Sequence, residues 1–68
     1  MINWDIIKGK WNQLQGEARK QWGQLTDDDW QQIAGERDKL IGKLQERYGW
    51  AREDAERRAD EFFSAHHR

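Results

Sequence analysis

The sequence predicts an all-α fold, a small bundle of about four helices built as two related, packed helical hairpins. Two observations support this prediction. Apolar residues over positions 4–22 recur at steps of three and four, which is the spacing of one face of an amphipathic helix. The chain also matches itself at an offset of 26 residues, as a duplicated structural unit does.

A single domain over residues 1–68 is expected, because a chain of this length encloses only one small core. The absence of cysteine excludes a disulfide framework and a thiolate metal site, so helix packing must stabilise the core. No apolar run exceeds two residues, which is too short for a membrane-spanning helix or a signal peptide. We therefore expect a cytoplasmic protein with no membrane partner.

The first helix is expected over residues 4–22. Asn3 can cap its start, and Gly23 stands where a left-handed residue would end it. The side chains predicted to face the core are Trp4, Ile7, Trp11, Leu14, Ala18 and Trp22.

The next helix is expected to begin directly after Thr26. Thr26 and Asp29, three positions on, have the spacing of a capping box. The acidic residues 27–29 lie in the first turn, where the helix dipole favours negative charge. Leu25 and Trp30 flank the cap as the two partners of a hydrophobic staple would.

The internal repeat places residues 4–29 over residues 30–55. Each unit comprises a helix, a glycine stop, a short turn and an acidic helix start. Chance would give about one or two identities in such an overlay. Seven pairs are identical, and they include all six glycines: Trp4/Trp30, Ile7/Ile33, Gly9/Gly35, Leu14/Leu40, Gly16/Gly42, Gly23/Gly49 and Asp28/Asp54.

The glycines of each unit are expected to differ in role. Gly23 and Gly49 should end helices, both at positive φ. Gly16 and Gly42 lie inside helices and away from the apolar stripe, where each costs roughly 1 kcal/mol relative to alanine. We favour close approach of another backbone as the reason for them, with a functional surface as the alternative.

Gly9 and Gly35 fall nearer the helix starts, where they indicate a kink or a break. Gly35 is expected to separate a helix at about 27–34 from one at about 36–48, although the repeat also permits a continuous helix there. The closing helix lies in residues 52–68. Its predicted apolar face comprises Ala51, Ala55, Ala59 and Phe62, with Phe63 beside them.

Few residues offer chemistry. His66 and His67 are adjacent and therefore point to different helix faces, which favours a solvated tail over a metal site. Ser64 stands in the same tail, and the acids at 27–29 already have a structural use as a helix start. We expect no catalytic residue, no metal, no cofactor and no small-molecule ligand.

The five tryptophans could stack on single-stranded bases or line a ligand groove. Trp50 overlays Gln24 in the repeat and has no counterpart in the stripe, so partial exposure is expected for it. Core positions are preferred for the four that keep the helical spacing, namely Trp4, Trp11, Trp22 and Trp30.

The formal net charge is −1, with 12 basic and 13 acidic residues. Such a chain has no overall field that attracts nucleic acid or an anionic membrane. One patch on the first helix could meet phosphate, although solvated charge is the commoner role of such residues: Lys8, Lys10, Arg19 and Lys20. Nucleic acid is therefore not the expected partner.

Three segments of the chain carry a resemblance: "GKWNQLQGEARKQWGQLTDDD", "IAGERDKLIGKLQERYG" and "AERRADEF". They resemble the CsbD-like family of small bacterial stress-response proteins over essentially the whole chain. The shared patterns are W-G-x-L-T-D-D-D at residues 22–29 and G-x-R-D-x-L-x-G-x-x-Q-x-R-Y-G at residues 35–49. The resemblance implies a bacterial cytoplasmic protein of the general stress response, folded as two packed hairpins. It implies no activity, cofactor or ligand.

Three functions stay open on the sequence. A non-catalytic interaction or protective module of the stress response, with an unknown macromolecular partner, is favoured over an enzyme. The alternatives are a weak nucleic-acid-binding helical-hairpin protein and a partly disordered hydrophilic protectant. The mean hydropathy of −1.30 is compatible with the partly disordered protectant. The sequence leaves the oligomeric state open.

Overall fold

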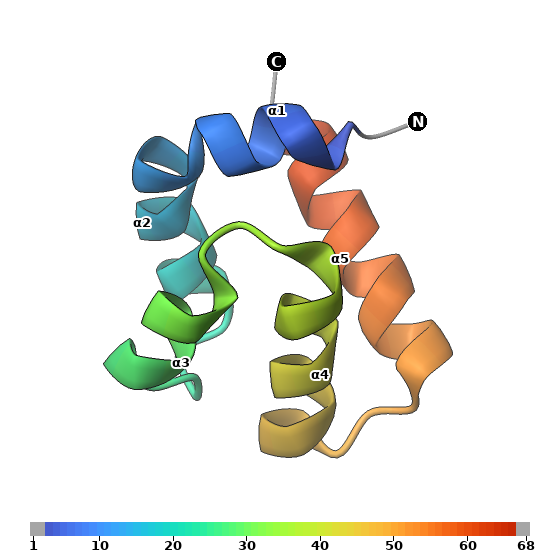
Figure 1. Cartoon of the computed structure of the whole chain (residues 1–68). Helices are drawn as coiled ribbons and strands as arrows, with labels where there is room; N and C mark the ends of the chain where they lie inside the picture. The colour runs from blue at the N-terminus through green and yellow to red at the C-terminus, as the bar shows by residue number, and fades with distance from the viewer. Residues whose placement is uncertain (1–2, 67–68) are drawn as a thin grey trace.

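Five helices make up most of the computed structural model, which describes residues 3–66 (Figure 1). Their bounds are α1 (Trp4–Gly9), α2 (Trp11–Gln21), α3 (Asp27–Ile33), α4 (Arg37–Tyr48) and α5 (Arg52–His66). α1 crosses above the other helices in Figure 1, and α4 packs along α5. The prediction of an all-α bundle is confirmed for these residues.

The predicted first helix is divided in two, which is why the structure has five helices where about four were expected. α1 ends at Gly9, and α2 starts after Lys10, whose φ of −106° and ψ of 15° depart from the helical range. A break near Gly9 is therefore confirmed. Asn3 caps α1 as predicted, because its side-chain oxygen accepts a hydrogen bond from the backbone N–H of Asp5 at 2.9 Å.

α3 begins with the predicted capping box. The backbone N–H of Thr26 donates to the Asp29 carboxylate at 3.0 Å, and the N–H of Asp29 donates to the Thr26 hydroxyl at 3.2 Å. Leu25 and Trp30 on either side of this cap are both buried, as the hydrophobic staple requires. The position and start of α3 were thus predictable from four residues.

The link between α3 and α4 contains two residues in the left-handed region. Ala34 has a φ of 47° and Gly35 a φ of 83°, so the predicted separation of two helices at Gly35 is confirmed. A Cβ atom built on Gly35 would lie 2.8 Å from the Cα atom of Lys8. α1 therefore packs directly against this link, and only glycine fits there.

The prediction of left-handed helix ends holds for one glycine of the pair. Gly49 caps α4 with a φ of 72°. The prediction is wrong for Gly23, which has no positive φ. α2 ends one residue earlier than expected, and Trp22 takes the capping position with a φ of −123° and a ψ of 72°. The chain turns there without a left-handed residue.

The expected close approach of another backbone at Gly16 and Gly42 does not occur within the single chain. A Cβ atom at either position would meet nothing within 4 Å, and both glycines are exposed. The reason is that α2 and α4 pack through their opposite faces, which carry residues such as Leu14 and Leu40. Close backbone approach occurs instead at Gly35.

The duplication appears in the helix bounds. α2 begins at residue 11 and α4 at residue 37, which is the predicted offset. In the overlay, Lys8 corresponds to Ala34 and Gly9 to Gly35. Lys8 therefore contacts the residue that follows its own counterpart in the second unit.

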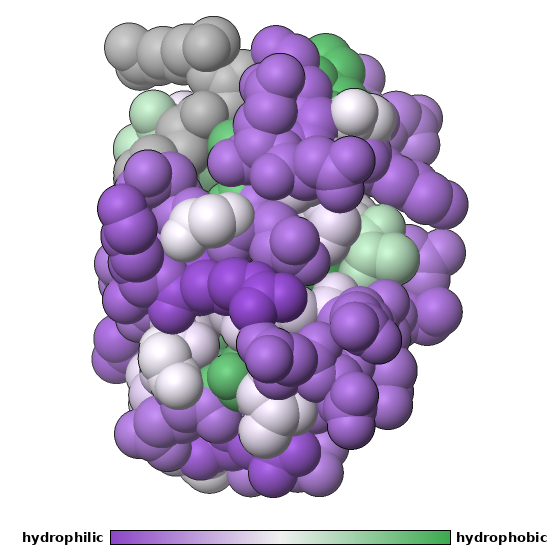
Figure 2. All heavy atoms as spheres, turned by 90° about the vertical axis from the view of Figure 1, so that its left-hand side faces the viewer, coloured by the Kyte–Doolittle hydropathy of each residue, from purple (hydrophilic) through white to green (hydrophobic). Residues whose placement is uncertain are grey.

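The core contains the apolar stripe predicted for the first helix. Its buried members are Ile7, Trp11, Leu14, Ala18, Trp22, Leu25, Trp30, Ile33, Leu40, Ile41, Leu44, Ala55, Ala59 and Phe63. Trp4 is half-buried and packs edge-on against Phe63, with the ring centres 5.0 Å apart. The face over α2 and α3 is dominated by hydrophilic residues (Figure 2).

The buried face of α5 differs from the predicted one. Ala55, Ala59 and Phe63, at steps of four, enter the core, whereas Phe62 is only half-buried. Ala51 is exposed because it precedes the first residue of α5. Phe62 lies at the edge of the core, where its ring centre is 4.9 Å from that of Trp22.

Candidate functional site

The structure does not bring the four basic residues of the predicted patch together. Lys8 belongs to α1, and its ammonium lies 3.6 Å from the carboxylate of Glu36. Lys10 precedes α2, while Arg19 and Lys20 lie in its last turn, about 13 Å along the helix axis. Arg19 forms an ion pair with Asp27, and Lys20 one with Glu17. The patch is therefore divided, and most of its charge is compensated.

The acidic start of α3 has the structural role that the sequence indicated. Asp29 is 2% exposed and accepts two hydrogen bonds from Arg47, at 2.8 and 3.2 Å. The ammonium of Lys43 lies 3.2 Å from the same carboxylate. Hydrogen bonds from Arg47 and from the Thr26 backbone hold the pKa of Asp29 well below its ordinary value. Asp29 is thus a fixed anion that joins α3 to α4.

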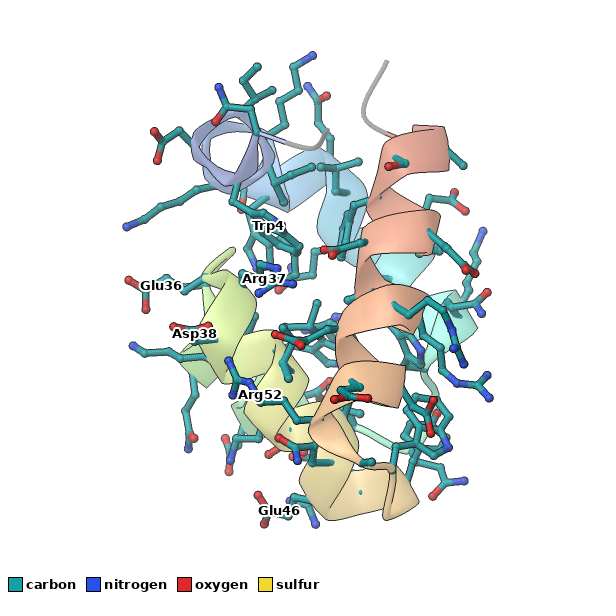
Figure 3. The ribbon with its side chains drawn as sticks, turned by 90° about the vertical axis from the view of Figure 1, so that its right-hand side faces the viewer. Trp4, Glu36, Arg37, Asp38, Glu46 and Arg52 are labelled. Carbon is teal, nitrogen blue, oxygen red and sulfur yellow. The ribbon has the colours of Figure 1, made fainter. Side chains whose placement is uncertain are left out.

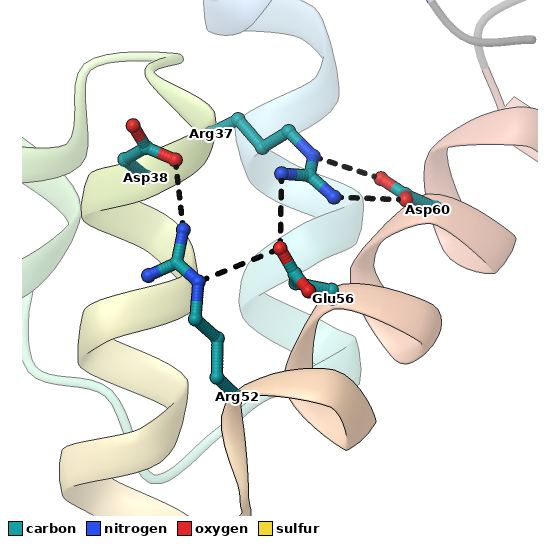
Figure 4. A network of polar contacts seen from close by, with 5 residues as sticks. All are labelled: Arg37, Asp38, Arg52, Glu56 and Asp60. Atoms are coloured by element: carbon teal, nitrogen blue, oxygen red, sulfur yellow. Dashed lines mark hydrogen bonds and ion pairs between the residues drawn. The ribbon is translucent and has the colours of Figure 1, made fainter.

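A second group of charges joins α4 to α5 (Figures 3 and 4). Arg37 donates two hydrogen bonds to Asp60, at 3.2 and 3.1 Å, and one to Glu56 at 3.4 Å. Arg52 reaches Glu56 at 3.5 Å and Asp38 at 3.1 Å. The bonds to Asp60 raise the pKa of Arg37. These side chains are engaged with one another, which gives them a structural role.

An aromatic hollow lies where α2, the α4–α5 turn and α5 meet. We call it the Trp50 hollow; its volume is about 440 Å³, and its lining residues are Gln21, Trp22, Tyr48, Trp50, Arg58, Glu61 and Phe62. Tyr48 stacks on Trp50, with ring centres 4.4 Å apart and planes 14° apart. The Arg58 guanidinium also lies 4.4 Å from the centre of the Trp50 ring. Trp50 is half-buried, as its place outside the stripe predicted.

The Trp50 hollow carries charge that the fold does not use in ion pairs. Within residues 3–66, neither Arg58 nor Glu61 has an ion-pair partner. Stacking on Trp50 orients the guanidinium while leaving its N–H groups available as donors. The hollow therefore offers an apolar wall, a cation and an anion to a binding partner.

Ser64, another chemical candidate from the sequence, is not among the residues that line this hollow. Ser64 is exposed on α5 and lines a shallow depression with Arg57, Asp60, Glu61 and Ala65. No group of three His, Cys, Asp or Glu residues that could hold a metal ion occurs among the residues that the structure describes. The imidazoles of residues 66 and 67 lie outside the described side chains. Over residues 3–66, no helix is long and apolar enough to cross a membrane.

Comparison with known proteins decides the family. Residues 5–57 match the model of the family described as CsbD-like. The chain belongs to the CsbD-like family. This membership agrees with the helical fold and with the patterns at residues 22–29 and 35–49.

CsbD-like relatives occur in several bacteria. A UPF0337 protein of Pseudomonas aeruginosa is 54% identical over 61 residues, which is 90% of this chain and 94% of the relative. The UPF0337 protein YjbJ of Escherichia coli is 46% identical over 65 residues, covering 96% and 94% of the two chains. A UPF0337 protein of Xanthomonas axonopodis is 56% identical over 55 residues, covering 81% and 80%.

Sequence reasoning identified one member of the Trp50 hollow and missed its partners. Trp50 stood out because it breaks the repeat. Arg58 and Glu61 gave no such signal, since both fit the charged face of an amphipathic helix. Their spacing of three residues places them on one side of α5, next to each other. The tertiary fold alone brings Trp22 and Tyr48 to them.

Proposed function

We propose that this CsbD-like chain is a bacterial cytoplasmic stress-response protein that acts by binding a macromolecular partner, without turning over a substrate. The observation that supports this proposal is the Trp50 hollow. Its aromatic walls can bind apolar side chains of a partner, and Arg58 and Glu61, which form no ion pair within the described residues 3–66, can bind polar ones. The other charge clusters, around Asp29 and Arg37, serve to hold the helices together.

A protein surface is the partner that suits the chemistry of the hollow. Side chains of a partner can lie against the half-buried rings of Tyr48 and Phe62, while their polar atoms meet Arg58 and Glu61. Tryptophan, tyrosine and arginine are the residue types that contribute most to protein–protein binding energy. Three such residues meet here, since Tyr48 and Arg58 each contact the ring of Trp50.

Nucleic acid suits the hollow less well. A base that stacked on Trp50 would compete with the Tyr48 ring and the Arg58 guanidinium, each 4.4 Å from its centre. Glu61 would repel a phosphate nearby. The overall charge of −1 adds no attraction.

The test is complementation in a bacterium from which the gene has been deleted. Survival under osmotic, heat and oxidative stress is compared for wild type, Trp50→Ala, and the double variant Arg58→Gln with Glu61→Gln. Ile6→Ala, which removes an exposed apolar side chain from α1, is the matched control. We expect the hollow variants to lose protection and the control to keep it, while far-UV dichroism shows all of them folded.

Site-specific crosslinking tests directly whether a partner contacts the Trp50 hollow. A photoreactive residue at position 50 should yield a discrete crosslinked species in stressed cells, and one at position 6 should not. Full protection by the hollow variants, together with no species specific to position 50, would refute binding through this hollow.

A further inference from the structure

We propose that two copies of this chain associate through the exposed face of α4, around Gly42, across a two-fold axis. This inference is independent of the Trp50 hollow, which lies elsewhere on the molecule. It starts from a residue whose role within one copy is unexplained. Gly42 lies in the middle of α4, yet a Cβ atom there would meet nothing within 4 Å.

A glycine in the interior of an exposed helix lowers helix stability relative to alanine. Within the single chain, nothing close to Gly42 requires the missing side chain. A second helix that crosses at this point would require it, because glycine allows two backbones to approach closely. The surface there is already hollowed, with a volume of about 470 Å³.

The charges around Gly42 identify a second copy as the occupant. Lys39 and Glu46 line the two ends of this hollow, three residues before and four residues after Gly42. In an antiparallel pair related by a two-fold axis through Gly42, each Lys39 lies opposite the Glu46 of the other copy. Two interchain ion pairs result when Lys39 exchanges its exposed contact with Glu36, at 2.9 Å, and Glu46 its contact with Lys43, at 3.8 Å, for the contact across the axis. Figure 3 shows Glu46 on the side of α4 away from α5, where a second molecule has access.

The one like charge near the axis is already neutralised. Lys43, next to Gly42, has its ammonium 3.2 Å from the buried Asp29 carboxylate and 3.8 Å from Glu46. Its side chain also lines the hollow, but the Asp29 carboxylate compensates its charge within the chain. The face is therefore self-complementary, as an interface between identical chains must be.

The repeat supplies an internal comparison. Gly16 occupies the equivalent position on α2 and is equally open. The positions that correspond to Lys39 and Glu46 are Gln13 and Lys20 there, which cannot form ion pairs across a two-fold axis. Association through Gly42 is therefore favoured over association through Gly16.

Sedimentation equilibrium of the full chain tests the proposal. α4 is only about 18 Å long, so the contact is small and the association weak, in the range of roughly 10 μM to 1 mM. The apparent mass of wild type should rise from 8.2 kDa towards twice that value over this range. Gly42→Leu should stay monomeric, and Gly16→Leu should associate like wild type.

Charge reversal shows whether Lys39 and Glu46 act across an interface between two copies or only within one chain. Lys39→Glu alone places like charges opposite each other and should weaken association about tenfold or more. Adding Glu46→Lys to that variant restores opposite charges across the axis and should restore association. Both side chains are exposed, so the variants should fold, and far-UV dichroism checks this.

Three results would overturn the proposal. They are a wild-type mass that stays at 8.2 kDa up to 1 mM, an equal loss of association in the two leucine variants, and a double variant no better than Lys39→Glu. Equal loss in both leucine variants would instead indicate that α2 of one copy contacts α4 of the next.

Discussion

Arg47 in α4 forms a two-point ion pair with Asp29 in the first turn of α3. Arg47 Nε donates to Asp29 Oδ2 at 2.8 Å, and Nη2 donates to Oδ1 at 3.2 Å. Asp29 also closes the capping box with Thr26. One carboxylate therefore fixes both the start of α3 and its packing on α4.

Asp29→Asn should lower the free energy of unfolding at neutral pH by about 1.5–3 kcal/mol, the usual loss for hydrogen bonds to a charged group. Urea denaturation measures the change. Asp28→Asn, an exposed residue of the same turn, should change the value by less than about 0.5 kcal/mol. Equal effects of the two substitutions would contradict a special role for Asp29.

The depressed pKa of Asp29 predicts a dependence of stability on pH. Its ordinary value is 3.8, and the folded protein holds it well below that. Such a carboxylate stabilises the fold fully above the unfolded pKa, and this contribution is lost as pH falls through the folded pKa. Stability should therefore decrease below about pH 4. Urea melts between pH 7 and pH 2 should show a shallower decrease for Asp29→Asn than for wild type.

Gly49→Ala and Gly23→Ala form a matched pair, because both glycines follow an aromatic residue at a helix end. Gly49 has a φ of 72°, and an alanine there should destabilise the protein by about 1 kcal/mol. Gly23 has no positive φ, so alanine should be tolerated at that position. Urea midpoints measure the stability of the two variants. Similar losses of stability at both positions would contradict the conclusion that, of the two, only Gly49 is left-handed.

Gly35→Ala should be more damaging than Gly49→Ala. Both positions are left-handed, but a Cβ atom at Gly35 would also lie 2.8 Å from the Cα atom of Lys8. Backbone must move to relieve this overlap, so we expect a loss of about 2–4 kcal/mol. Chemical denaturation provides the measurement, and a loss no larger than that of Gly49→Ala would argue against tight packing of α1 on the link.

The isolated protein should unfold in one cooperative step. Trp11, Trp22 and Trp30 are buried in one core, so tryptophan fluorescence and far-UV dichroism should change together on heating. Trp4 and Trp50 are half-buried, and Trp50→Phe removes one of them, so that the remaining fluorescence reports more directly on the buried tryptophans. A gradual, featureless melt at neutral pH would favour the partly disordered protectant.

Binding to nucleic acid should be weak and strongly dependent on salt. Four phosphate contacts, the most that Lys8, Lys10, Arg19 and Lys20 could make, would give a slope of log K against log salt of roughly −3 to −4. Titration with single-stranded and duplex DNA and RNA at physiological salt measures the affinity. Sub-micromolar binding that is abolished by neutralising these four residues would reverse the proposed ranking of functions.

Local sequence signals were sufficient to predict most helix ends. The Thr26 cap, the break at Gly35 and the stop at Gly49 each depend on residues within one turn. The end of α2 was less predictable, because a turn after Trp22 can form with or without a left-handed residue. The buried face of α5 was predicted incorrectly because its position along the chain was uncertain by one residue. A shift of one residue rotates a helical face by about 100°, which exchanges Phe62 for Phe63.

The candidate site was less predictable than the fold. Trp50 was identified because it departs from the repeat. Tyr48 overlays Trp22 in the repeat, which gave no sign that its ring stacks on Trp50. Arg58 and Glu61 meet these rings through the packing of α5 on α4, a contact between residues that are distant in sequence. Helical periodicity carries no information about such contacts.

The contact between Trp4 and Phe63 has a consequence for the order of folding during synthesis. These rings, 5.0 Å apart, connect the first helix to the last, and Phe63 also lies near the rings of Trp11 and Trp22. The N-terminal helices therefore leave the ribosome before the aromatic residue that completes their core has been released. Until Phe63 has left the ribosome, the tryptophans of the nascent chain lack this partner and are open to capture by chaperones.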